Sequence, residues 1–174
     1  MADNIKQYVK LSNSNVLSLF NSKKRLEDTY NILADDLYET NINVYMNKKG
    51  IKCLKNAEDK SIVLGSKGFF EGVDVPGDGL VFVTLDKLPN LNPTDPLYFS
   101  IMTKFNKNYF DVNYPQMIIK VKQALGRLLR SKYDYGVFVL FNMGNSTYIN
   151  KKLENNLHGC IITEANRNNI QRYI

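Results

Sequence analysis

Several features that would assign this chain to a common class are missing from its sequence. The 174 residues include two cysteines, Cys53 and Cys160, and one histidine, His158, and none of them has further ligands at zinc spacing. Neither a zinc site nor a disulfide framework is indicated, and a reducing compartment fits best. No motif places a serine or cysteine nucleophile beside His158, so we expect a structural role for it.

Targeting and membrane-spanning segments are also missing. The N-terminus, Met1 to Asn4, lacks a cationic start followed by an apolar run. No apolar stretch approaches the roughly 20 residues that a bilayer-spanning helix needs. Internal repeats and low-complexity segments are absent as well. We therefore expect a cytoplasmic protein that does not contact a membrane.

The composition is that of one globular domain. With 44% hydrophobic and 23% charged residues, a chain of this length can bury a sizeable core. The 23 Lys and Arg residues exceed the 17 Asp and Glu residues, which gives a net charge of +6 and a pI near 9.2. This balance favours a polyanionic partner such as nucleic acid, but many proteins without such a partner are equally basic.

Continuous apolar runs recur along the chain. Their residues do not alternate between polar and apolar, as they would in a sheet with one solvated face, so they predict strands buried on both sides. The runs cover residues 16–20, 42–46, 61–64, 80–85 and 137–141. Ligands of parallel sheets bind at the carboxyl ends of the strands, which directs attention to the loops that follow these runs.

Helical signals separate the apolar runs. Helical spacing over 5–9 and 26–37 predicts two helices, the second of which is capped by Ser22. Proline near the first helical position predicts another helix that begins near Asp95 and a longer one over 113–130. The alternation of strands and helices predicts a three-layer α/β domain, in which helices cover both faces of a mainly parallel sheet.

The end of the longest predicted helix presents polar groups along one stripe. At about 100° per residue, Gln123, Arg127 and Arg130 share a face, with Gly126 beside them. Two arginine forks and an amide suit the oxygens of a terminal phosphate. A glycine in mid-helix costs on the order of 1 kcal/mol relative to alanine, so Gly126 predicts the close approach of a ligand. The alternative is a solvated basic face on an amphipathic helix.

A glycine-rich loop over residues 65–79 follows the third apolar run. Its glycines permit tight turns and bring backbone N–H groups close to a ligand. Glu71 and Asp74 supply acceptors and Lys67 supplies a cation. The alternative is an ordinary connection between two strands.

Considered together, the two segments resemble motifs of the DinG family of helicases, which is close to XPD. Residues 65–79 are similar to helicase motif V, residues 123–131 to motif VI, and residues 19–22 to the Phe-Thr-Ser segment after the first strand. The resemblance spans nearly the whole chain. It implies the second RecA-like domain of a superfamily 2 DNA helicase, with the fold of P-loop NTPases. Asn21 and Asn142 depart from the family pattern, which often has Thr and Asp there.

The resemblance implies a role for individual residues. Those implied to be catalytic, as arginine fingers and their neighbour, are Gln123, Arg127 and Arg130. Those implied to bind the nucleotide are Glu71, Gly72, Asp74 and Gly126. Those implied to lie along a track for single-stranded DNA are Ser22, Lys23, Ser66 and Lys67.

The other half of a nucleotide site is missing from the sequence. There is no Gly-x-x-x-x-Gly-Lys-Ser/Thr loop, no acidic strand end in place of Walker B and no cysteine cluster for an iron–sulfur centre. We therefore expect ATP and Mg²⁺ to be bound mainly by an N-terminal RecA-like domain, in cis or in trans, with no metal site in this chain. The alternative is a stand-alone module that binds nucleic acid or a helicase and does no chemistry.

Overall fold

A parallel sheet forms the centre of the computed structural model, which describes residues 1–55, 60–69, 80–129, 134–164 and 172. Its five strands are hydrogen-bonded in the order β2-β3-β1-β4-β5, and every neighbouring pair is parallel. The strands are β1 (Asn15–Leu19), β2 (Asn43–Met46), β3 (Ser61–Gly65), β4 (Leu80–Leu85) and β5 (Val137–Leu140). All five predicted strands and their parallel arrangement are thus confirmed.

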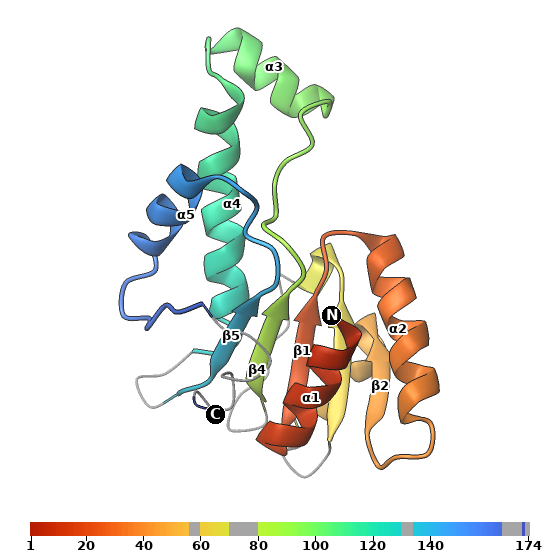
Figure 1. Ribbon diagram of the computed structural model, residues 1–174. Helices are drawn as coiled ribbons and strands as arrows, with labels where there is room; N and C mark the ends of the chain where they lie inside the picture. The colour runs from red at the N-terminus through yellow and green to blue at the C-terminus, as the bar shows by residue number, and fades with distance from the viewer. Residues whose placement is uncertain (56–59, 70–79, 130–133, 165–171, 173–174) are drawn as a thin grey trace.

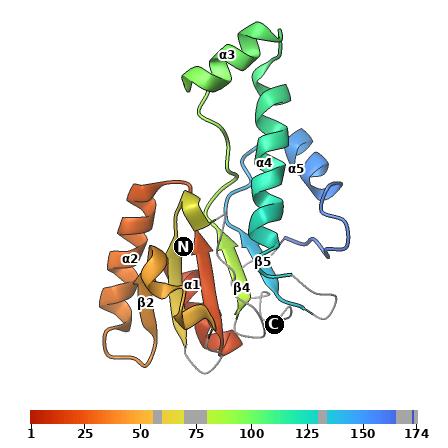
Figure 2. The ribbon, with the colours of Figure 1, turned by 180° about the vertical axis from the view of Figure 1, so that it is seen from behind.

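Helices cover both faces of the sheet (Figure 1, Figure 2). On one face lie α1 (Ala2–Ser12) and α2 (Lys23–Leu37), and on the other lie α4 (Tyr109–Leu125) and α5 (Thr147–Glu154). The predicted three-layer α/β architecture is confirmed. Three short 3-10 helices complete these layers, η1 (Asn47–Gly50), η2 (Cys53–Lys55) and η3 (Lys67–Phe69).

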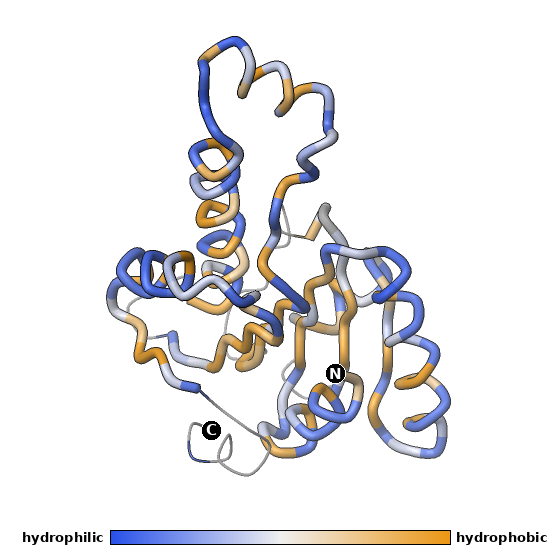
Figure 3. Tube along the Cα trace, turned by 45° about the horizontal axis from the view of Figure 1, so that its top comes forward, coloured by the Kyte–Doolittle hydropathy of each residue, from blue (hydrophilic) through white to orange (hydrophobic). Residues whose placement is uncertain are grey.

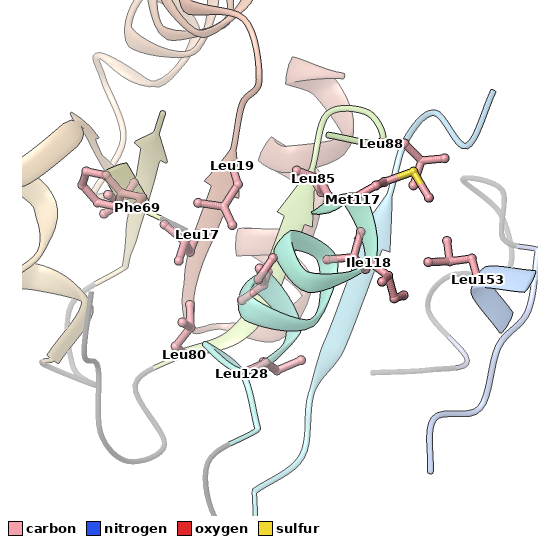
Figure 4. Packing of buried hydrophobic residues seen from close by; sticks show 14 of the residues in the cluster. Leu17, Leu19, Phe69, Leu80, Leu85, Leu88, Met117, Ile118, Leu128 and Leu153 are labelled. Atoms are coloured by element: carbon pink, nitrogen blue, oxygen red, sulfur yellow. The ribbon is translucent and has the colours of Figure 1, made fainter. Parts of the chain in front are cut away.

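Successive residues of each strand pack against opposite layers. In β1, Val16 packs with α1 and α2, whereas Leu17 and Leu19 pack with α4. Figure 4 shows the second cluster, in which Met117 and Ile118 of α4 lie over the sheet. Hydrophobic residues accordingly concentrate along the strands (Figure 3). Because every residue of β1 and β3 is buried, these strands are read from the sequence as continuous apolar runs.

Two predicted helix starts are confirmed by their side-chain caps. The Ser22 hydroxyl accepts a hydrogen bond from the Arg25 N–H at the start of α2. The carboxylate of Asp95 accepts one from the Leu97 N–H at the start of α3 (Pro96–Lys104), whose first residue is the predicted proline. α3 lies at the end of an arm that projects away from the sheet (Figure 1), and none of its residues is buried.

The predicted start of α4 near residue 113 is wrong. The helix begins earlier, at Tyr109, because Asn108 and Asp111 form a capping box with hydrogen bonds of 2.9 and 3.4 Å. Pro115 lies inside the helix. Asn113 does not cap it, and instead its side chain accepts a hydrogen bond of 2.7 Å from the Leu91 N–H. This contact ties α4 to the segment that leaves β4.

Candidate functional site

The carboxyl ends of all five strands meet at one edge of the sheet, which we call the carboxyl edge. The register pairs Leu19 with both Gly65 and Leu85, and Leu85 in turn with Leu140. Polar residues follow every strand there, in the spatial order Asn47, Ser66, Asn21, Asp86 and Asn142. This is the edge at which ligands of parallel sheets bind.

Asn21 and Asp86 fasten the exits of β1 and β4 to each other. The backbone N–H and the side-chain amide of Asn21 both donate to Oδ1 of Asp86, at 3.0 and 3.1 Å. The same amide donates to the Lys87 carbonyl at 2.7 Å. The Asn21 side chain is therefore engaged within the protein.

The second oxygen of the Asp86 carboxylate faces an arginine. Oδ2 lies 3.9 Å from Nε of Arg25, in the first turn of α2, and accepts no hydrogen bond in the described part of the chain. Asp86 is fully buried, whereas the Arg25 side chain is 45% exposed. The carboxyl edge thus contains a buried negative charge beneath a half-exposed positive one.

Three residues predicted for the DNA track lie together at this edge. β1 and β3 are neighbours, and the N–H of Phe20 donates to the Gly65 carbonyl at 2.8 Å, so the segments containing Ser22 and Ser66 leave the sheet side by side. The Ser66 hydroxyl lies 3.4 Å from Oδ1 of Asn47. The Lys23 side chain is 86% exposed and 3.7 Å from Glu27. For Lys67 the structure describes the backbone but not the side chain.

The polar residues at the end of α4 lie at the opposite edge, where the strands begin, which we call the amino edge. Leu128 packs near Val81, the second residue of β4, and the close-up in Figure 4 shows Leu128 beside Leu80. Gln123 and Arg127 are both half-buried there, and Nε of Arg127 is enclosed. The described members of the predicted nucleotide and DNA sets therefore occupy two edges, not one.

The prediction that Gly126 interrupts a helix is wrong. α4 ends at Leu125 and Gly126 is its C-cap, with an ordinary right-handed φ of −66°. The chain then tightens, since the Arg127 N–H donates to the Ala124 carbonyl three residues back. A glycine at a helix end does not carry the cost of one in mid-helix, so Gly126 gives no support for a ligand.

Comparison with known proteins places this architecture in one family. Residues 5–160 match the helicase C-terminal domain family. The chain belongs to that family. It is 32% identical over 154 residues to the 3'-5' exonuclease DinG of Staphylococcus epidermidis and 32% identical over 151 residues to that of Staphylococcus aureus strain MSSA476. These matches cover 85% and 83% of the chain but 17% of each relative.

A solved structure agrees with the fold of this helicase C-terminal domain. The structure of S. tokodaii Xpd4 matches 90% of the chain and 33% of its own length, with a TM-score of 0.53 and 19% sequence identity. At that identity the likeness concerns the fold alone, which is RecA-like. The expected second RecA-like domain of a DinG/XPD-type helicase is therefore confirmed as to family and fold.

Part of the predicted site lies outside the described residues. This holds for Glu71, Gly72 and Asp74 of the motif V segment and for Arg130 of the motif VI segment. The described residues on either side of residues 70–79 lie at different edges of the sheet, since Ser66 follows β3 and Leu80 begins β4.

A close contact at the amino edge was not predicted from the sequence. A Cβ atom on Gly136 would lie 2.5 Å from both Leu128 Cδ1 and the Val81 carbonyl oxygen. Only glycine fits between Leu128 of the motif VI segment and the start of β4. Gly136 therefore helps to fix the chain directly after Arg127.

The described part of this helicase C-terminal domain contains neither a metal-binding cluster nor a membrane-spanning helix. Among the described residues, no group of three or more His, Cys, Asp or Glu side chains is arranged to hold a metal ion. No helix in the same part of the chain is long and apolar enough to cross a membrane.

Proposed function

We propose that this domain is the second motor domain of an ATP-dependent DNA helicase. It supplies arginines to an ATP site that another RecA-like domain completes, and it forms part of a track for single-stranded DNA. The observation that supports the proposal is that the described members of the two predicted residue sets lie at opposite edges of one sheet, in a chain of the helicase C-terminal domain family. A helicase motor needs its ATP site and its DNA site at a fixed distance, because ATP hydrolysis at one site must move the DNA strand at the other.

The amino edge is the proposed nucleotide side. Arg127 is half-buried and its Nε atom is enclosed, so part of its planar guanidinium group is already removed from solvent, which favours binding to phosphate oxygens. Gln123 lies one helical turn before it. ATP, bound with Mg²⁺ by the partner domain, would supply the terminal phosphoanhydride bond that is hydrolysed. The guanidinium of Arg127 would stabilise negative charge on the terminal phosphate, together with Arg130.

The remaining nucleotide contacts are proposed from the family resemblance alone. They are Glu71, Gly72, Asp74 and Gly126. Gly126 also serves as the C-cap of α4.

The carboxyl edge is the proposed DNA side. Ser22 and Ser66 bring hydroxyl groups to neighbouring strand ends, and Lys23 and Lys67 add positive charge. Hydroxyl, amide and ammonium groups in this arrangement hold a sugar–phosphate backbone without reading bases. Binding of this kind is expected to weaken steeply with salt.

The same contacts also suit a module that binds nucleic acid or a helicase without chemistry. The chain spans 17% of the relatives it matches, and its sequence contains no phosphate-binding loop. The exonuclease activity in the relatives' name belongs to those much longer proteins.

One pair of measurements tests the proposal on the chain itself. The isolated chain should show no ATP turnover above blank, with or without DNA, yet bind a labelled single-stranded oligonucleotide with a strong salt dependence. A Lys23→Ala/Lys67→Ala double variant should bind more weakly. Turnover that survives repurification and disappears in Arg127→Ala would show that no second domain is needed. Binding unaffected by salt or by the double variant would show that the DNA surface is assigned wrongly.

A further inference from the structure

The hydrogen bonds that join β1 to β4 do not require a negative charge on Asp86. Its Oδ1 atom accepts both hydrogen bonds from Asn21, and a neutral amide oxygen would accept them equally well. A buried carboxylate is strongly disfavoured unless its partners compensate it fully. Here Oδ2 has only the ion pair with Arg25, at 3.9 Å. The charge therefore acts on the arginine.

The first turn of α2 carries an unusual concentration of positive charge. Lys23, Lys24 and Arg25 occupy it in succession, and it contains no acidic residue. The N-terminus of a helix is the positive end of its dipole, so cations there are unfavourable and anions favourable. Lys23 is close to Glu27 and Arg25 to Asp86, and these are the two ion pairs that this turn forms with described residues. A bound polyanion would relieve the remaining repulsion.

We propose that Arg25 contacts a backbone phosphate of single-stranded DNA at the carboxyl edge, and that buried Asp86 is the positioning residue that orients it. The inference rests on the proposed DNA side of this domain and extends it to two residues that the motifs do not include. Nε of Arg25 is the atom that approaches Asp86. Its terminal nitrogens, which form no hydrogen bond with any described residue, form a planar fork that matches two phosphate oxygens.

The direction in which Asp86→Asn changes DNA affinity distinguishes a positioning role from a general effect of charge. Asp86→Asn removes a negative charge next to the proposed DNA path, so long-range electrostatics alone predict tighter binding. If Asp86 orients Arg25, the same change weakens binding, because the guanidinium loses the group that directs it. The amide oxygen of the asparagine can still accept the hydrogen bonds from Asn21, which preserves the junction.

The experiment titrates a fluorescent oligodeoxythymidine with the intact chain at several KCl concentrations. Arg25→Ala should weaken binding about tenfold at low salt, as expected for one charge-assisted contact. The slope of log affinity against log salt should fall by about 0.7, the value for one phosphate of a single strand. Lys10→Ala is the matched control, because it removes the same charge from an exposed site at the end of α1 that leads into the amino edge. It should change affinity less than about twofold.

Two further variants complete the test. Asp86→Asn should weaken binding, and adding it to Arg25→Ala should cause no further loss, since the two residues act as one unit. Arg25→Lys should recover only part of the affinity. Tighter or unchanged binding by Asp86→Asn would overturn the positioning role. If Asp86→Asn does not fold, the comparison of the half-exposed Arg25 with Lys10 still decides the phosphate contact.

Failure of the proposed function would look different. If the unmodified chain does not bind the oligonucleotide at low salt, the DNA side of the proposed function is wrong and this inference falls with it. If the chain binds with the expected salt dependence but Arg25→Ala behaves like Lys10→Ala, only this inference is wrong.

Discussion

The two edges of the sheet are held in place by different kinds of contact. At the carboxyl edge, hydrogen bonds and ion pairs join the strand exits, as between Asn21, Asp86 and Arg25. At the amino edge, Leu128, the residue after Arg127, packs against Gly136. This contact is so close that a methyl group added to Gly136 would not fit. Strands of about five residues separate the edges by roughly 16 Å. A sheet of this kind can therefore keep the proposed DNA side and the proposed nucleotide side at a fixed distance, and substitutions at one edge should leave the other edge unchanged.

The largest expected effect is that of Arg127→Ala at the amino edge. In the assembled two-domain enzyme, DNA-stimulated ATP turnover should fall on the order of 10³–10⁵-fold, the range for arginine fingers in phosphoryl transfer. Arg127→Lys should not rescue it, because an ammonium cannot reach two oxygens with fixed geometry. Affinity for single-stranded DNA should stay within about twofold, since no contact at the carboxyl edge changes. Equal losses of turnover and DNA affinity would contradict the separation of the edges.

Gly136→Ala should destabilise the domain by about 1–3 kcal/mol, the cost of overpacking a filled site. The added methyl group would meet the Val81 carbonyl oxygen, a backbone atom that cannot move without disturbing the start of β4. The measurement is the urea midpoint of the isolated chain. Gly68→Ala is the control, because a Cβ atom there would have no described neighbour within 4 Å. If both variants unfold at the same urea concentration, the amino edge has room for a methyl group at Gly136 and the prediction is wrong.

A smaller loss is expected from Ser22→Ala at the carboxyl edge. It removes the acceptor for the Arg25 N–H and should lower the free energy of unfolding by about 1 kcal/mol, as for other N-cap serines. Ser22→Asn should restore most of this stability, because asparagine caps equally well. Thermal melts of the three proteins give the comparison. An alanine variant as stable as the parent would mean that the cap contributes nothing to α2.

The smallest effect concerns Tyr114, which belongs to neither edge. Burial raises the pKa of its hydroxyl, the hydrogen bond from Asn156 lowers it and nearby Tyr148 raises it. Because the folded pKa lies above the unfolded value of about 10, the contribution to stability is complete below pH 10 and is lost as pH rises through the folded pKa. Urea unfolding at pH 9 and pH 11 should show a smaller decline for Tyr114→Phe. Identical declines would assign the alkaline loss to other groups.

The sequence and the structure agree best where one local pattern decides the outcome. Apolar runs predicted the five strands, and Ser22 predicted the start of α2. The expected burial on both sides holds for β1 and β3, whereas the edge strands β2 and β5 contain no fully buried residue, because each has a neighbour on one side only. The start of α4 was misjudged because two signals compete there, and the capping box of Asn108 and Asp111 prevails over Pro115. α5 went unpredicted, since its eight residues offer few helical repeats.

Within the candidate site, the sequence singled out residues that belong to a motif. Gln123 and Arg127 were predicted from their spacing and family resemblance, and their roles stay predictions, whereas their place at the amino edge was not predicted. Asp86 was not predicted, because a single acidic residue after a strand is common. Only the tertiary structure buries it and places Asn21 and Arg25 around it. Gly136 escaped notice because its constraint comes from Val81 and Leu128, neither of which is adjacent to it in sequence.

The strand order has a consequence for how the chain is made. β1 lies at the centre of the sheet, yet it is synthesised before both of its neighbours, β3 and β4. At about 5–20 residues per second, the ribosome needs on the order of ten seconds to proceed from β1 to the end of β5. Parallel pairing cannot begin until the later strands emerge, and such long-range pairing is itself slow. For the fully buried central strand, the time between its own synthesis and the synthesis of its last neighbour is thus the longest in the sheet.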